Sequence, residues 1–279
     1  MSFLTVALAI LGFGTLMLAP VLLALAVSNG RQHRWVRRHA VTPCAALRPG
    51  ARLPQRLAVY GQTVPGRDGL VTAPLSGAEA VWFRTTVCAI DDVGDPGLTR
   101  TAVLWEQSAG DPFGVADNTG TVAVSAEILQ ASTYNPRLSV LAQTRLPVAH
   151  AGPTPVRTVV DEETTSHRRN GRWLQQVVDR GLVPADAARR VERVRVMEQI
   201  VPAGVALHVI GKPAVLDSGV AALTLPSTGR YLVQSREPTE TERELAGDRT
   251  YGMGCALWTG LVGVAALAAI WAIGLMTGR

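Results

Sequence analysis

Two short motifs in the last third of the chain resemble known functional signatures. In Ala206–Lys212, the pair Gly211-Lys212 follows a small residue at the spacing of a phosphate-binding loop. The next residue is Pro213, where such a loop needs a Ser or Thr for magnesium, and the intervening residues are typical of a strand. Leu225–Gly229 has the form of a sortase recognition pentapeptide, but about two dozen residues separate it from the next apolar segment. We therefore predict a strand for the first motif and a turn for the second.

Residues that could ligate metal or act as nucleophiles are scattered along the chain. The histidines and cysteines lack the short spacings of zinc ligands, and neither a G-x-S-x-G elbow nor an H-E-x-x-H helix occurs. The acidic runs at 91–92 and 161–163 are typical of a solvated face. We therefore assign no catalytic, cofactor-binding or metal-ligating residue. The scattered residues are His33, His39, His150, His167, His208, Cys44, Cys88 and Cys255.

A cluster of arginines concentrates positive charge between positions 168 and 193. Its members are Arg168, Arg169, Arg172, Arg189, Arg190 and Arg193, with Arg195 close behind. If the cluster faces a bilayer or a protein partner, it would attract anionic groups, at about 1 kcal/mol per residue for lipid. If it faces Glu192, Glu198 and the acidic segment 239–248, its charge is balanced internally. The sequence leaves both hypotheses open.

The overall charge does not predict a nucleic-acid partner. The chain has 27 Lys and Arg against 22 Asp and Glu, a net charge of +5. Acidic residues are interspersed with the basic ones, aromatic residues make up only 5%, and no recognition motif occurs. We expect the partners to be membrane lipid or protein.

Two uncharged segments near the ends of the chain are long enough to cross a membrane. Residues 3–27 would extend over more than a hydrocarbon core of about 30 Å at 1.5 Å per residue. A cleaved signal peptide is the alternative, but no basic residue precedes this segment and no convincing cleavage site follows it. Residues 253–276 form the second span, with Trp258 and Trp271 near its ends. Ala256 and Gly260 would let another helix approach, so a homo-oligomer is a hypothesis that the sequence leaves open.

Arginines near the spans predict the orientation of the chain. Basic residues gather on the inner side of both spans, at Arg31, Arg34, Arg37, Arg38, Arg243 and Arg249, with only Arg279 beyond the second. By the positive-inside rule, we expect a two-pass protein of the cell membrane. Its middle domain would be cytoplasmic and both termini would lie outside.

Residues 31–252 are predicted to form one water-facing domain in which short strands predominate. Strands are predicted at 56–64, 80–90, 101–107, 113–116, 121–125, 193–200, 205–210 and 231–235, and helices at 171–180, 184–191 and 239–248. Residues 117–120 are predicted to form a hairpin turn. The expected fold class is α+β, mainly β, between two terminal transmembrane helices. A proline-bearing segment at 134–155 would divide the domain into two small β lobes, and a weak echo between residues 57–61 and 207–211 favours this division.

The order of these features resembles that of a known family. A span is followed by a Val-Tyr-Gly strand, by Thr72–Ser76 with Val81–Arg84, by Phe113–Gly120, by Glu198 before Pro202–Gly204, and by a second span. This arrangement resembles the GIDE, or beside-a-membrane, domain of the mitochondrial ubiquitin ligase activator family and its bacterial relatives. The positions that carry the resemblance are Gly61, Pro74, Leu75, Trp82, Arg84, Phe113, Asp117, Gly120, Glu198, Gly204 and Gly211.

The resemblance implies a function that the chain itself is not expected to perform. In eukaryotic members, the E3 ubiquitin ligase activity belongs to a zinc-binding RING after the second span, whereas this chain ends at Arg279. We therefore expect a RING-less bacterial relative, and our first hypothesis is a non-enzymatic binding or scaffold module at the membrane surface. The alternatives are an E3 ligase-like transferase and an unrecognised membrane-bound hydrolase. The eukaryotic domain lies on the non-cytosolic side of its membrane, which conflicts with the orientation that the arginines predict.

Overall fold

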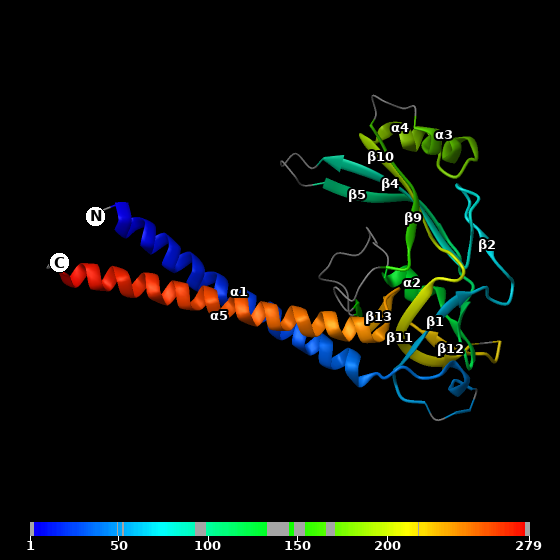
Figure 1. Cartoon of the computed structure of the whole chain (residues 1–279). Coiled ribbons are helices and arrows are strands. Elements are labelled where there is room, and N and C mark those ends of the chain that lie inside the picture. Colours follow the sequence, from blue (N-terminus) through cyan, green and yellow to red (C-terminus); the bar gives the residue numbers. More distant parts are fainter. Residues whose placement is uncertain are drawn as a thin grey trace. The chain divides into compact units, whose positions relative to one another are not determined.

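The chain folds into two compact units that carry the predicted architecture. The computed structural model describes residues 3–48, 50–51, 53–92, 99–132, 145–147, 154–165, 171–216 and 218–276. One unit comprises Met1–Arg38 with Thr239–Arg279, and the other comprises His39–Pro238. Apolar helices near both ends flank a β-rich domain, which confirms the expected α+β class (Figure 1).

The helical unit consists of α1 (Phe3–Arg38) and α5 (Pro238–Met276). Both helices are long and apolar enough to cross a membrane, which fits a two-pass membrane protein. α1 continues through Pro20, as a helix supported by a membrane and a neighbouring helix can. Each helix also extends beyond its apolar segment into polar residues, because the predicted helix at 239–248 is continuous with the second span.

Small residues bring α1 and α5 together as an antiparallel pair. A Cβ added to Gly263 would lie 3.2 Å from the Gly12 carbonyl oxygen, and a Cβ added to Gly260 would lie 3.9 Å from the Ala19 Cβ. Ala256 is also buried. Such close approach is how helices pack where lipid removes the hydrophobic driving force. The helix that approaches the small residues of the second span is therefore α1 of the same chain.

The β-rich domain contains most of the predicted strands and several others. Its strands are β1 (Leu57–Val64), β2 (Val71–Thr72), β3 (Glu79–Ala80), β4 (Trp82–Asp92), β5 (Thr99–Ser108), β6 (Phe113–Asp117), β7 (Gly120–Val124), β8 (Arg145–Pro147), β9 (Arg157–Thr165), β10 (Arg193–Val201), β11 (Ala206–Val215), β12 (Ala221–Thr224) and β13 (Gly229–Gln234). Its helices are η1 (Cys44–Ala46), α2 (Ala126–Ser132), α3 (Arg172–Asp179) and α4 (Ala185–Arg190). All eight predicted strands form, whereas the structure adds β2, β3, β8, β9, β12 and α2, which were not predicted.

Five of these strands close into a barrel. The strand order is β1-β6-β7-β12-β11, and β11 pairs back with β1 to close the ring. Neighbours are antiparallel except for β12 and β7, which are parallel. Val59, Phe113 and Leu223 belong to the main apolar core. β13 and β8 continue the sheet beyond β11.

The two segments of the sequence echo are partners in this barrel. They pair antiparallel and in register, from Leu57 opposite Gly211 to Gly61 opposite Leu207. A Cβ on Gly61 would lie 2.2 Å from the Ala116 carbonyl oxygen of β6, and Gly211 is confined in the same way by β12. Glycine in a strand marks this kind of close approach by a neighbouring backbone. The echo therefore describes the two strands that close a single barrel.

A separate four-stranded antiparallel sheet has the order β5-β4-β10-β9. One of its faces buries Val87, Val194 and Val196 against Leu174 and Val177 of α3. Figure 1 shows α3 next to this sheet. Both the barrel and this sheet take strands from each side of residues 134–155, most of which lie outside the described residues. The two β assemblies are thus interleaved in sequence.

Candidate functional site

Glu198 is a fully buried carboxylate on β10 that holds a turn of the chain in place. Its Oε2 accepts hydrogen bonds from the Leu75 N–H (2.8 Å) and the Thr85 hydroxyl (2.9 Å), and its Oε1 accepts one from the Ser76 N–H (2.8 Å). Burying a carboxylate costs several kcal/mol unless such donors compensate for lost water. Pro74 begins this turn, so three of the family-motif positions serve one structural contact.

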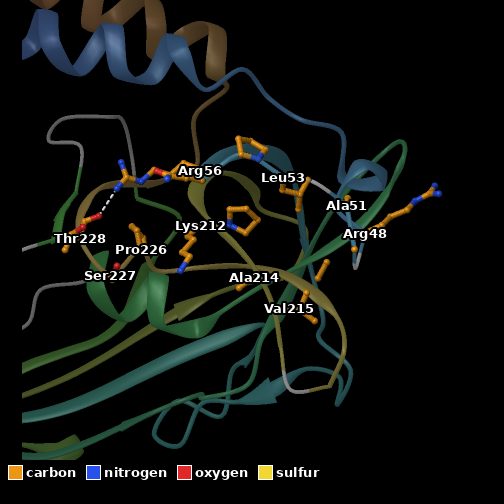
Figure 2. A pocket seen from close by; sticks show the side chains of 15 residues that line it. Arg48, Ala51, Leu53, Arg56, Lys212, Ala214, Val215, Pro226, Ser227 and Thr228 are labelled. Atoms are coloured by element: carbon orange, nitrogen blue, oxygen red, sulfur yellow. Dashed lines mark hydrogen bonds between the residues drawn. The ribbon is translucent and has the colours of Figure 1, made fainter.

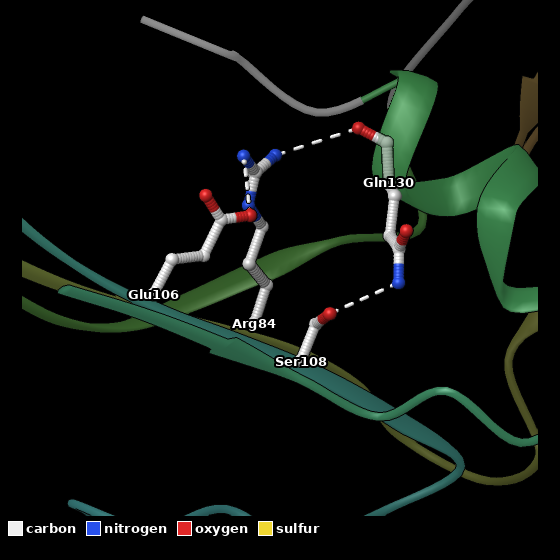
Figure 3. A network of polar contacts seen from close by, with 4 residues as sticks. All are labelled: Arg84, Glu106, Ser108 and Gln130. Carbon is white, nitrogen blue, oxygen red and sulfur yellow. Dashed lines mark hydrogen bonds and ion pairs between the residues drawn. The ribbon is translucent and has the colours of Figure 1, made fainter. Parts of the chain in front are cut away.

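Arg84 is the centre of a second buried network, shown in Figure 3. Its Nη2 lies 3.0 Å from Glu106 Oε1 on β5, and its Nη1 donates to the Gln130 carbonyl oxygen of α2 (3.4 Å). The Gln130 side-chain amide in turn donates to the Ser108 hydroxyl on β5 (2.9 Å). Trp82, at the start of the same strand, is fully buried. These bonds fix α2 against the four-stranded sheet.

Asp117 closes the β6–β7 hairpin and ties it to the segment that precedes β1. Its Oδ1 accepts hydrogen bonds from the Thr119 N–H (2.7 Å), the Thr119 hydroxyl (2.6 Å) and the Gly120 N–H (3.1 Å). Its Oδ2 accepts one from the Cys44 N–H (2.8 Å). Desolvation alone would raise the pKa of Asp117, but these donors to the ionised carboxylate hold it well below its usual range. The hairpin turn predicted at 117–120 is confirmed.

Cys44 and His208 are buried groups with suppressed ionisation. Desolvation and the nearby carboxylate of Asp117 raise the pKa of the Cys44 thiol to about 11, which keeps it protonated and unreactive at neutral pH. Burial lowers the pKa of His208 to about 4, so its imidazole is uncharged at neutral pH. The His208 Nδ1 lies 3.2 Å from the Gln234 side-chain nitrogen. Within the described part of the chain, no three His, Cys, Asp or Glu residues gather in a way that could hold a metal ion.

The remaining family-motif positions shape the backbone and the core. Phe113 is buried in the main core. Gly204 has a φ of +77° in the turn between β10 and β11, a conformation that favours glycine. Its N–H donates to the Thr63 carbonyl oxygen at 2.7 Å. Together with Gly61 and Gly211, these residues position strands and carry no reactive group.

The arginine cluster lies beside acidic residues that sequence reasoning had left as a solvated run. Arg195 binds Asp161 of β9 through two bonds, from Nε (2.8 Å) and Nη2 (2.7 Å), and these hold the pKa of Asp161 below its usual value. Arg193 lies 3.2 Å from Glu163. The run 161–163 thus lies on the edge strand β9, where Asp161 and Glu163 face the arginines of β10.

The other members of the cluster are also accounted for. Arg190 pairs with Asp186 within α4 (3.1 Å), and the Arg172 guanidinium lies over the Trp173 ring, 4.9 Å from its centroid. The side chain of Arg189 is not described, and Arg168 and Arg169 lie outside the described residues. Internal charge balance is therefore the arrangement found for Arg190, Arg193 and Arg195.

A hollow of about 520 Å³ opens where three segments of the domain meet (Figure 2). It is lined by described residues between 48 and 56, by the end of β11 from Lys212 onward, and by the turn at 226–228 that joins β12 to β13. Arg56 donates from Nη2 to the Thr228 carbonyl oxygen at 2.7 Å. Lys212 is exposed, and no acidic residue is among the described residues that line the hollow.

Sequence reasoning did not predict this hollow, although both motifs that it singled out contribute to it. Lys212 ends the first motif, which is indeed a strand, and Pro226–Thr228 of the second motif lie in what is indeed a connection between strands. Arg56 carries no local signal, because its significance depends on which strand pairs with β1. The only feature of the sequence that pointed to the hollow is a basic residue next to each echoed segment: Arg56 precedes residues 57–61, and Lys212 follows residues 207–211.

Comparisons with protein-family models, with curated proteins and with solved structures find no match to this chain. The site must therefore be interpreted from its own residues.

Proposed function

We propose that this protein is a two-span membrane protein whose barrel domain is a non-enzymatic binding module at the membrane surface. The observation that carries the proposal is a contrast between polar groups that bind other groups of the protein and polar groups that face open space. Glu198, Arg84 and Asp117 form hydrogen bonds or ion pairs with other groups of the same chain. The cations of the hollow instead face a space large enough for a small ligand or a partner's side chains.

Membrane attachment supports a role in binding at the bilayer surface. Two apolar helices would hold the domain at the membrane, so a ligand or partner would meet it at high effective concentration. The arginines that follow α1's apolar segment support our proposal that the domain is cytoplasmic in a cell membrane, with both termini outside. The proposed kinship with the GIDE family is supported by its motif positions, many of which perform structural tasks in one domain.

Site-specific photocrosslinking in native membranes tests the proposed binding role. A photoreactive amino acid would replace Thr228, which is exposed at the hollow, and a matched control would replace Gln175, which is exposed on α3. We expect a discrete lipid or protein adduct from position 228 and none from position 175. Equal labelling at both positions, or no adduct at 228 in a folded protein, would contradict a binding site at the hollow.

Metal analysis of the purified chain tests the enzymatic alternatives that require zinc. We expect less than a stoichiometric amount of tightly bound zinc, because the described residues hold no ligand cluster. Stoichiometric zinc that resists a chelator would overturn the binding-module proposal in favour of a metal-dependent or ligase-like activity.

Labelling with an impermeant thiol reagent in intact cells tests the proposed orientation. Cys44 and Cys88 are buried, so they are poor reporters. The exposed position Gln175 is suitable, and Gln175→Cys should react only after the membrane is opened. Reaction before opening would show that the domain faces outward.

A further inference from the structure

The two basic residues of the hollow, Arg56 and Lys212, lie at the open end of the β1–β11 ladder. The last rung of that ladder pairs Leu57 with Gly211. Arg56 lies one residue before the first of these and Lys212 one residue after the second. Arg56 lies in the bend before β1 and Lys212 lies on β11, and both line the hollow, so the fold brings two positive side chains to one surface. Like charges at such positions repel each other unless something neutralises them.

The protein supplies no acidic neutralising partner among the described residues. Arg56 uses one of its five N–H donors on the Thr228 carbonyl oxygen. Lys212 forms no ion pair with a described residue, and none of the described residues that line the hollow is acidic. In Figure 2 the Lys212 side chain lies among the lining residues, the Arg56 guanidinium extends toward Thr228, and Arg48 points away from them. The local charge available to a ligand is therefore that of two cations.

The wall of the hollow is rigid and adds polar groups beside the cations. Pro54, Pro213 and Pro226 restrict its backbone, and Ser227 and Thr228 contribute hydroxyl groups. Gly229, with a φ of +86°, follows the turn, and a Cβ there would lie 2.6 Å from the Arg56 guanidinium. The absence of that side chain is what allows the arginine to lie against the turn.

We infer that the hollow binds the phosphoryl group of a phosphate ester, with Lys212 and Arg56 both contacting the phosphate oxygens. A phosphomonoester carries a charge of about −1.5 to −2 at neutral pH, which matches two cations better than a single carboxylate does. Arginine donates in a fork and lysine acts as a compact charge, the two common ways of binding phosphate. A volume of about 520 Å³ exceeds what a bare phosphate fills, so the ester's organic group also fits.

This inference rests on the proposed binding function and names the ligand chemistry of the same site. The phosphoryl group could belong to a soluble metabolite or to the headgroup of a membrane lipid. Both sources offer the same oxygens to Lys212 and Arg56, so the experiment must separate them.

Binding to the full chain in nanodiscs tests the inference and separates the two sources. In phosphatidylcholine nanodiscs, glycerol 3-phosphate and inorganic phosphate would be titrated by calorimetry, with acetate as the carboxylate control. In a second arm, the rate of photocrosslinking from position 228 to lipid would be compared between nanodiscs with and without phosphatidic acid. Saturable binding of glycerol 3-phosphate supports a soluble ester, and crosslinking that requires phosphatidic acid supports a lipid headgroup.

Variants with matched charge loss make the test specific to the hollow. Lys212→Gln should weaken phosphate-ester or phosphatidic-acid binding at least tenfold, and Lys212→Arg should retain most of it. Arg190→Gln, which removes an equal charge from α4, should leave binding unchanged. Equal binding of acetate, no saturable binding in either arm, or an equal loss in Lys212→Gln and Arg190→Gln would overturn the inference. A protein adduct from position 228 with no phosphate binding would sink the inference while leaving the proposed binding function intact.

Discussion

Basic side chains have acidic neighbours in one part of the domain and none among the described residues in another. The first part is the ladder between β9 and β10, and the second is the end of the ladder between β1 and β11. In the first, Arg195 and Arg193 lie beside Asp161 and Glu163, so each charge has an acidic neighbour within the sheet. At the second, Arg56 and Lys212 line one hollow that has no acidic residue among its described lining. Arginine density in the sequence is therefore a poor guide to a binding surface. A basic side chain is available to a ligand only where the fold places no acidic side chain beside it.

The largest effect that would sharpen this comparison is expected at Glu198. Glu198→Leu removes the acceptor of three donors, of which the Leu75 N–H and the Thr85 hydroxyl are buried and the Ser76 N–H is partly buried. Each orphaned donor costs about 1–3 kcal/mol, so we expect a loss of about 3–5 kcal/mol in the free energy of unfolding. Urea unfolding of the full chain in detergent, followed by circular dichroism, measures this loss. A change below about 1 kcal/mol would mean that the buried contacts do not hold the domain together.

A second large effect is expected when the pH is lowered. The pKa of His208 is about 4 in the folded chain, below its unfolded value of about 6.5. The unfolded state therefore gains a proton first, so stability is full above pH 6.5 and falls as the pH drops toward 4. The loss over this window is about 3 kcal/mol.

The control for the pH effect is a chain that lacks the imidazole. His208→Gln keeps a polar side chain of similar reach beside Gln234, and its unfolding free energy should change less between pH 7 and pH 4.5 than that of the parent chain. Equal pH dependence in the two chains would assign the effect to other groups. The carboxyl of Asp117, whose pKa is lowered, titrates in a separate window below its ordinary value.

A smaller effect distinguishes the paired arginines. Arg195→Gln breaks a bond to Asp161 that uses both oxygens, but both side chains are about half exposed, so solvent screens the pair. We expect a destabilisation of about 0.5–1 kcal/mol that shrinks at high salt. Urea unfolding at low and high ionic strength measures it. An effect that did not respond to salt would point to lost packing instead of lost charge.

The smallest effect, with the opposite sign, is expected at the hollow. In phosphate-free buffer, Lys212→Gln removes one of two neighbouring cations and should leave stability unchanged or raise it by up to about 0.5 kcal/mol. The same unfolding measurement compares it with Arg195→Gln. Destabilisation by both variants to the same extent would erase the distinction between the two ladders.

The structure also explains which predicted elements formed and which were missed. The strands at 82–92 and 113–117 and the hairpin at 117–120 were predictable because alternation and turn residues are local signals. β9 was missed because Asp161, Glu162 and Glu163 resemble a solvated run, although their partners are on β10 and α3. Glu162 accepts hydrogen bonds from the first N–H groups of α3, a role that only tertiary contact creates.

The sequence by itself determined the two long apolar helices, the β-rich domain between them and most strand positions, because each depends on hydrophobic length or on period. The tertiary structure decided which strands pair, and therefore that residues 57–61 and 207–211 close one barrel. It also decided which charges are neutralised. Strand pairing joins residues that are far apart in the chain, and no local pattern records that Arg56 and Lys212 will line one hollow.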